Sequence, residues 1–279
     1  MQQIRSPIYF GRMRAAMVAL ALLQFFCGAA SAADEVKIGG TGSALGTMRL
    51  LAEKFSQINP GIKITTVGNL GSAGGIKAAG SGAIDLAVSS RSLNASERKL
   101  GLSELEFART PFVFAVSTKS TVSAITRHEL AGIYSGRILK WPDGSAIRVV
   151  LRPPSDIDTE IVKEITPALG QAVAAAERRP GVRFSVTDQD AAGDLERIPG
   201  AIGPSSLSLI LSERRTLRAL TLDGVEPTPA NAVSGDYPLY KRMSFVTGAK
   251  SSAAVERFVA FVQSPAGRKV LNETGHWVP

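Results

Sequence analysis

Small polar residues gather at three places in the amino-terminal part of the chain. They occur in TGSALG (41–46), NLGSAGG (69–75) and SSR (89–91). Glycine and serine leave backbone N–H groups uncovered, hydroxyls donate hydrogen bonds, and Arg91 adds a guanidinium, so the chemistry these segments could perform together is anion binding. In GNLGSAGGIK (68–77) no charge precedes the final lysine, and its glycines would let the backbone approach an oxyanion closely.

Each segment also has an ordinary structural explanation. Ser43 and Ser72 belong to a residue type that caps helices, and Arg91 is equally consistent with a solvated surface position. GGTGSALG lacks the spacing of a dinucleotide fingerprint, and NLGSAGGIK lacks the Gly-Lys-Ser/Thr of a nucleotide-binding loop. The prediction of an anion site therefore depends on the three segments lying together.

Alternating strands and helices would bring the three segments to one place. VKIGG (36–40), IKITTV (62–67) and IDLAVS (84–89) have the composition of strands, with helical patterns after Ser43 and over about 73–79 between them. A β-α-β-α-β series predicts a parallel sheet with right-handed crossovers. Ligands of such sheets bind at the carboxyl ends of the strands, where these loops lie.

A second α/β segment begins near Ser117. HELAGIYSG (128–136) has a helical pattern, and IRVVLR (147–152) reads as a strand that ends in Arg152. We predict that Ser155 caps the next helix, whose first turn carries two aspartates. Arg152, at the carboxyl end of a strand, is a further candidate for the anion site.

The first 33 residues have the order of a secretory signal peptide. Three arginines precede the apolar run AAMVALALLQFFCGAA (15–30), and small residues ending in SAA follow it. Cys27, the only cysteine, follows two phenylalanines, which argues against lipidation. We expect a cleaved leader, a location in the periplasm and a domain without disulfides.

Charge and histidine content exclude several other classes of function. The formal net charge of +8 includes the three leader arginines, and no basic run interleaved with aromatics suggests a nucleic-acid surface. His128 and His276 are the only histidines, and neither has the neighbours of a metal site or a catalytic triad. We expect no catalytic residues, no metal and no cofactor.

Six segments resemble, in the same order, the phosphate-binding proteins of bacterial ABC transporters. They are GTGSALG, NLGSAGGIKAAGSGAIDLAVSSR, IYSGRILKWPDGSAIRVVLR, IPGAIG, DYPLYKRMSF and SPAGRKVLNETG. The resemblance spans nearly the whole chain after the leader, and its second, third and last segments are the distinctive ones. It implies a type II periplasmic binding protein with an α/β fold of two lobes.

The resemblance also implies how the lobes divide the chain. Lobe 1 would comprise 34–115 plus 240–279, and lobe 2 would comprise 116–239. Each lobe would hold a mainly parallel sheet flanked by helices. Two extended hinge crossings would join the lobes, which would close on the ligand.

The family's ligand contacts fall on particular residues of this chain. By the resemblance, the first loop would bind the anion through the backbone of Ser43, Ala44 and Leu45, and the second through the Ser72 hydroxyl. Arg152 matches the family's arginine clamp, and Ser155 matches the serine of the Ser-Gly-Thr that follows the arginine after two intervening residues. The implied partners are phosphate or a similar oxyanion and an inner-membrane ABC permease, with the binding protein a monomer.

Two positions depart from the family pattern. Ser90, followed by Arg91, stands where the family often has an aspartate that accepts the proton of hydrogen phosphate. Asp156 and its neighbour replace the glycine and threonine of the fourth loop, and Asp158 lies close by. These two aspartates either cap the helix, pair with Arg91 or Arg152, point to solvent, or supply the acceptor missing at Ser90. Without such an acceptor, discrimination of phosphate from sulfate would be weaker.

Three functions are compatible with these residues. The first is a periplasmic solute-binding protein that delivers phosphate or a related oxyanion to an ABC permease. The second is a sensor or scavenger of oxyanions on the same fold. The third, an exported phosphoester hydrolase, would need a nucleophile with a base or a metal cluster that the sequence does not offer.

Overall fold

The computed structural model describes residues 34–181 and 183–279, and its first part has the predicted alternation of strands and helices. The predicted leader and Cys27 lie outside the described residues. The elements in order are β1 (Asp34–Gly40), α2 (Gly42–Ile58), β2 (Ile62–Asn69), α3 (Gly71–Gly80), β3 (Leu86–Ser89), α4 (Ala95–Arg98) and β4 (Ser103–Ser117).

The middle of the chain is richer in helices and has only short strands. Its elements are β5 (Ala124–Ile125), α5 (Arg127–Ser135), β6 (Arg148–Val149), α6 (Ile157–Ile165), α7 (Pro167–Glu177), α8 (Asp188–Arg197), β7 (Ala201–Ser206), α9 (Leu207–Ser212), β8 (Leu217–Ala219), β9 (Thr221–Leu222) and α10 (Pro229–Ser234). The chain then returns through β10 (Tyr240–Thr247) and ends with α11 (Ala253–Gln263) and α12 (Pro265–Glu273).

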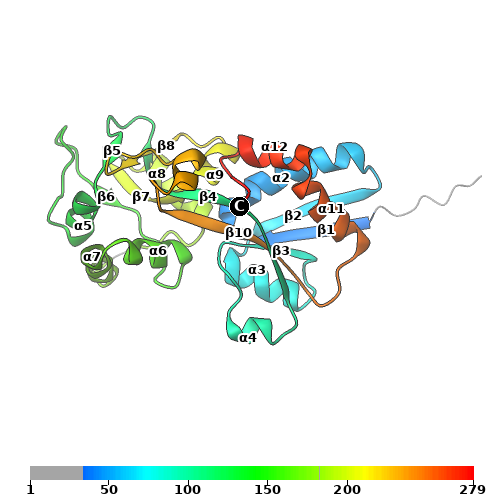
Figure 1. Cartoon of the computed structure of the whole chain (residues 1–279). Coiled ribbons are helices and arrows are strands. Elements are labelled where there is room, and N and C mark those ends of the chain that lie inside the picture. The colour runs from blue at the N-terminus through cyan, green and yellow to red at the C-terminus, as the bar shows by residue number, and fades with distance from the viewer. Residues whose placement is uncertain (1–33, 182) are drawn as a thin grey trace, which may run out of the picture. The chain divides into compact units, whose positions relative to one another are not determined.

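One mixed sheet runs through the described chain in the order β2-β1-β3-β10-β4-β7-β6, and β8 also pairs with β4. The strands β2, β1 and β3 are parallel, as the β-α-β series predicts, so their carboxyl ends share one edge. The returning strand β10 is antiparallel to both β3 and β4. In Figure 1, α2, α11 and α12 lie on one side of β1 and β2, and α3 lies on the other.

The long strand β4 belongs to both halves of the sheet. Its first part, up to Pro111, pairs with β10, and its second part, from Phe112, pairs with β7 and β8. The N–H of Phe112 donates to the carbonyl oxygen of Leu239, directly before β10. The two extended segments expected near 112–117 and 240–247 therefore meet end to end near Phe112, and β10 runs beside residues 103–111 of β4 instead.

Two large hydrophobic cores lie on either side of this crossing. The first packs α2, α11 and α12 against the β1, β3 and β10 strands, with Phe55, Phe245 and Phe258 in edge-to-face contact. The second packs α5, α6 and α7 around Phe112 and Phe114 of β4. These cores give the expected α/β architecture of two lobes.

Two predicted helix caps are wrong by one or two residues. The N-cap of α2 is Thr41, and Ser43 lies inside the helix. The N-cap of α6 is Asp156 rather than Ser155, because the Asp156 carboxylate accepts the N–H of Asp158. A carboxylate caps a helix as well as a hydroxyl does, so residue type alone did not separate the neighbours.

Glycines of the first two loops mainly allow close contact between elements. A Cβ on Gly75 of α3 would lie 2.7 Å from the Cα of Gly40, so the pair lets α3 pack against the end of β1. Gly40 has φ +135°, and Gly71 begins α3 at φ +64°. Gly68, in contrast, has no atom within 4 Å of an added Cβ.

We predict that Gly40→Ala destabilises the protein strongly. An alanine Cβ would lie 2.0 Å from the carbonyl oxygen of Val88, which also accepts the Thr41 N–H, and the positive φ adds strain. The expected loss is roughly 2–4 kcal/mol in the free energy of unfolding, measured by urea denaturation.

Gly61→Ala is the matched control for this substitution. Gly61 has no atom within 4 Å of an added Cβ and does not have positive φ, so its replacement should change stability by less than about 0.5 kcal/mol. Equal stabilities of the two variants would show that the contact between Gly40 and Val88 imposes no constraint.

Candidate functional site

The helices α2 and α3 begin differently from the other helices that the structure describes. Neither Thr41 nor Leu70, their N-cap residues, accepts a first-turn N–H through its side chain. Every helix from α4 to α12 has such a side-chain cap. At α3 one N–H, that of Gly71, donates to the Asn69 side chain. The remaining first-turn donors of α2 and α3 are thus not used by N-cap side chains, which suits an anion.

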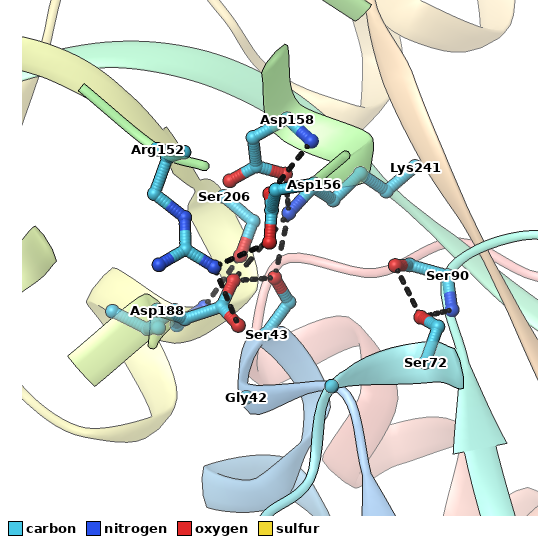
Figure 2. A network of polar contacts seen from close by, with 12 residues as sticks. Gly42, Ser43, Ser72, Ser90, Arg152, Asp156, Asp158, Asp188, Ser206 and Lys241 are labelled. Carbon is cyan, nitrogen blue, oxygen red and sulfur yellow. Dashed lines mark hydrogen bonds and ion pairs between the residues drawn. The ribbon is translucent and has the colours of Figure 1, made fainter. Parts of the chain in front are cut away.

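Ser72 and Ser90, predicted from separate loops, lie together. Their hydroxyl oxygens are 3.0 Å apart, and the Ser90 N–H donates to the Ser72 oxygen at 2.9 Å. Figure 2 shows this pair beside the start of α3. The structure therefore joins the second and third loops through two of the predicted residues.

Arg91 lies at the same edge but its guanidinium is already paired. It donates to both carboxylate oxygens of Glu97, at 2.8 and 2.7 Å. The hydrogen bond to Glu97 raises the pKa of Arg91. Arg91 pairs with neither Asp156 nor Asp158 among the described contacts, so that alternative is not the arrangement found.

Arg152 is buried at the carboxyl end of the strand segment that contains β6, with 4% of its surface exposed. Its Nη1 donates to the carbonyl oxygen of Ser185 at 2.5 Å, and its Nη2 donates to Asp156 at 2.7 Å. Its Nε has no partner among the described residues. Asp156 thus caps α6 and pairs with Arg152, which combines two of the predicted alternatives.

Lys241 is a central residue that the sequence reasoning missed. Its side chain is fully buried on β10, forms an ion pair with Asp158, and donates to the Ser43 hydroxyl at 2.8 Å. Consecutive residues of a strand face opposite sides, so one of Lys241 and Arg242 had to face inward. That alternation was the available signal.

Asp158 is the buried partner of this lysine and does not point to solvent. Burial raises the pKa of Asp158 to about 6, against the opposing attraction of Lys241. Burial alone would lower the pKa of Lys241, but Asp158 and Asp188 outweigh this effect and raise it. The pair is thus a buried charge with its counter-ion, at the start of α6.

Asp188, the first residue of α8, is the second group that was missed. Its carboxylate accepts the Ser43 hydroxyl at 2.8 Å and the Asn69 amide at 3.3 Å. It also lies 3.6 Å from Lys241 Nζ and 3.8 Å from Arg152 Nη2. Burial alone would raise its pKa, but the two cations hold the pKa of Asp188 below its usual value.

The start of α8 is further tied to the first loops by Gln189. Its amide nitrogen donates to the carbonyl oxygen of Gly42 at 3.1 Å, and its amide oxygen accepts from Asn69 at 2.8 Å. Ser208 of α9 donates to the carbonyl oxygen of Ser43 at 2.8 Å. Residues far apart in sequence therefore hold α2, β2, α8 and α9 together at one place.

A cavity of about 200 Å³ lies above this cluster. Four predicted site residues line it, together with Asp188 and others: Ser72, Arg91, Ser155 and Asp156. Ser43 and Arg152 are buried next to Asp188. Ala44 and Leu45 are buried within α2, and the Ala44 N–H already donates to the carbonyl oxygen of Thr41 at 3.2 Å.

Neither a metal cluster nor a membrane-spanning helix is present among the described residues. Residues 34–181 and 183–279 contain no group of three His, Cys, Asp or Glu side chains arranged to hold a metal ion. In the same ranges no helix combines the length and the apolar character needed to span a bilayer. His276 is buried near the carboxyl terminus, where burial lowers its pKa to about 4.

Comparisons with known proteins agree with the geometry. A family model described as a PBP superfamily domain matches residues 28–266. The chain is 25% identical over 265 residues to the phosphate-binding protein PstS of Bacillus subtilis, covering 90% of this chain and 83% of the relative.

Solved structures show the same fold. A structure from Clostridium perfringens, assigned as a phosphate ABC transporter substrate-binding protein with bound phosphate, has a TM-score of 0.76 and 25% identity, covering 88% of this chain and all of that one. An ABC-type phosphate transport receptor from Vibrio cholerae has a TM-score of 0.60 and 23% identity, with the same coverage.

We predict that Lys241→Met destabilises the protein and that the loss depends on pH. The substitution leaves Asp158 buried without its cation, so at pH 7 unfolding should become easier by about 3–5 kcal/mol. Lys241 lowers the pKa of Asp158, so without the lysine the carboxyl keeps its proton to a higher pH than the value of about 6 that it has in the parent. The loss should therefore shrink as pH falls toward 6, because below that pH Asp158 is protonated in both folded proteins.

Lys269→Met is the control, because Lys269 is 77% exposed and lies 3.9 Å from Glu273. Such a surface pair contributes little, so this variant should stay within about 0.5 kcal/mol of the parent. Chemical denaturation at pH 5 and pH 7 measures both variants. A loss for Lys241→Met that does not vary with pH would contradict the role assigned to Asp158.

Proposed function

The chain belongs to the PBP superfamily, and we propose that it is a periplasmic substrate-binding protein that captures phosphate or a related oxyanion for uptake by an ABC transporter. The 25% identity to a phosphate-binding relative over 90% of the chain supports this proposal. So does the likeness to a structure with bound phosphate that the chain covers completely. Both relatives are named as binding proteins.

The observation that carries the proposal is the absence of side-chain caps at α2 and α3 alone among the described helices. Both helices begin at loops predicted to bind the anion. The Ser72 hydroxyl lies at the start of α3, and Arg152 is buried nearby behind Asp156 and Asp188. Helix N-termini, hydroxyls and a guanidinium are the donors that a small oxyanion needs.

The proposed site residues follow from this arrangement. Ser72 and Ser90 would bind from one side of the cavity, and Ser155 from the other. Ser43 and Arg152 would bind from beneath, after rearrangement of their present partners. Arg91 would act mainly on the electrostatic potential, because Glu97 occupies its guanidinium. Backbone contacts at Ala44 and Leu45 stay a prediction.

The division into lobes is part of the proposal. Residues 34–115 with 240–279 would form lobe 1, and 116–239 would form lobe 2. The strands β4 and β10 are paired up to Pro111, and the Phe112 N–H donates to the carbonyl oxygen of Leu239 directly before β10. This arrangement supports a hinge where the two strands pass between the lobes. The cavity residues come from both segments, so closure of a hinge would enclose a ligand between them.

We predict that Arg152→Ala weakens phosphate binding by a factor of about 30 or more. Removing one buried, charge-assisted hydrogen-bond partner of an anion typically costs about 2–5 kcal/mol of binding free energy. Isothermal titration calorimetry with inorganic phosphate measures the change. Arg197→Ala is the control, because Arg197 is 74% exposed and its partners among the described residues, Asp194 and the carbonyl oxygen of Gly193, belong to its own helix. Parental affinity in Arg152→Ala would contradict the proposed clamp.

Export is proposed from the leader sequence, which lies outside the described residues. We predict that the protein recovered from the periplasm begins at or near Asp34 and carries no lipid. Amino-terminal sequencing and intact-mass measurement test this, with whole-cell lysate as the comparison. A periplasmic protein that retains residues 1–30, or that is lipidated at Cys27, would contradict the prediction.

A further inference from the structure

The carboxylate of Asp188 occupies the donors that an oxyanion would need. Figure 2 shows it between Arg152 and Ser43, with Lys241 close by. We propose that Asp188 is an internal competitor of the oxyanion, which must displace this carboxylate, and that Asp188 thereby sets the affinity of the site. The inference rests on the proposed oxyanion-binding function.

Four groups from four parts of the chain surround this carboxylate. Ser43 of α2 donates to Oδ1 at 2.8 Å, and Lys241 of β10 lies 3.6 Å from the same oxygen. Asn69, at the end of β2, donates to Oδ2 at 3.3 Å, and Arg152 lies 3.8 Å from it. Hydroxyl, amide, ammonium and guanidinium groups around one planar anion are also the recognition set for phosphate.

The balance of charge gives the second reason. The buried cluster holds two cations, Arg152 and Lys241, and three carboxylates, Asp156, Asp158 and Asp188. The cluster is therefore already negative when all five groups are ionised. A phosphate placed beside it would add one or two further negative charges in a poorly solvated place. Displacement of one carboxylate relieves this repulsion.

Asp188 is the carboxylate that can leave at least cost. Asp158 is buried behind Lys241, and Asp156 holds the N-cap of α6. The helix of Asp188 is capped by Thr187 and Asp190 instead, so it does not need the Asp188 side chain. Asp188 also lines the cavity, and rotation of its side chain toward that space would release Ser43, Asn69 and one side of Arg152.

This competition makes a quantitative expectation possible. If the carboxylate holds these donors in roughly nine molecules of ten, it weakens the apparent affinity about tenfold relative to the intrinsic affinity. Asp188→Asn keeps the size of the side chain and its acceptor for Ser43 but no longer neutralises the cations. We therefore expect it to bind inorganic phosphate about tenfold more tightly than the parent, with a similar gain for sulfate.

The experiment is calorimetric titration of the full exported chain with phosphate and with sulfate. Asp188→Ser accompanies Asp188→Asn, and it decides the outcome if the asparagine variant does not fold. Asp190→Asn is the matched control, because it removes the same charge from the same helix turn at an exposed position and leaves a side-chain oxygen to accept the Thr187 N–H. It should leave both affinities within about twofold of the parent.

The outcomes separate the inference from the proposed function. Tighter binding of both anions by the Asp188 variants, but not by Asp190→Asn, supports the competitor. Unchanged or weaker binding overturns it, and so does weaker phosphate with stronger sulfate, which would make Asp188 the missing proton acceptor. If the parent binds phosphate and only the Asp188 result fails, the proposed function stands. If neither the parent nor any variant binds either anion, both are overturned.

Discussion

The buried cations Arg152 and Lys241 constrain the rest of the structure. A charge removed from water is tolerated only when it is paired and hydrogen-bonded, so each cation requires carboxylates close by. Those carboxylates come from the starts of α6 and α8, and Lys241 comes from the strand that returns after the middle of the chain. Pairing these charges therefore fixes where the returning strand, both helices and the first loop must meet.

The sheet explains why the meeting place is an edge rather than the core. Parallel strands β2, β1 and β3 end together, and each is followed by a loop of small residues. Close packing between Gly40 and Gly75 brings α3 against β1, so the starts of α2 and α3 lie near each other. The glycines thus act indirectly on the site, by positioning helix N-termini rather than by lining the cavity throughout.

Local patterns predicted the fold well because their signals lie within a few residues. Periodicity located β1 to β3, and the loops after these strands held Ser72 and Ser90, which the structure pairs. Lys241 and Asp188 were missed because their roles depend on partners at distant positions, such as Ser43. Asp188 follows a threonine at a helix start, where an aspartate has an ordinary explanation. The cap of α6 was misplaced because serine and aspartate are equally good caps.

The proposed anion site separates electrostatic attraction from directed hydrogen bonding, two contributions that usually act together. The cations are neutralised within the protein, at distances of 2.7 Å for Arg152 with Asp156 and 3.6 Å for Lys241 with Asp188. While those ion pairs are intact, attraction between the cations and an incoming anion therefore cannot dominate recognition. What remains are directed donors: hydroxyls, an amide and uncapped helix starts, whose positions the fold determines. Because such donors act only at short range, the shape of the cavity would govern which anion binds, and the displacement of one internal carboxylate would govern how tightly it binds.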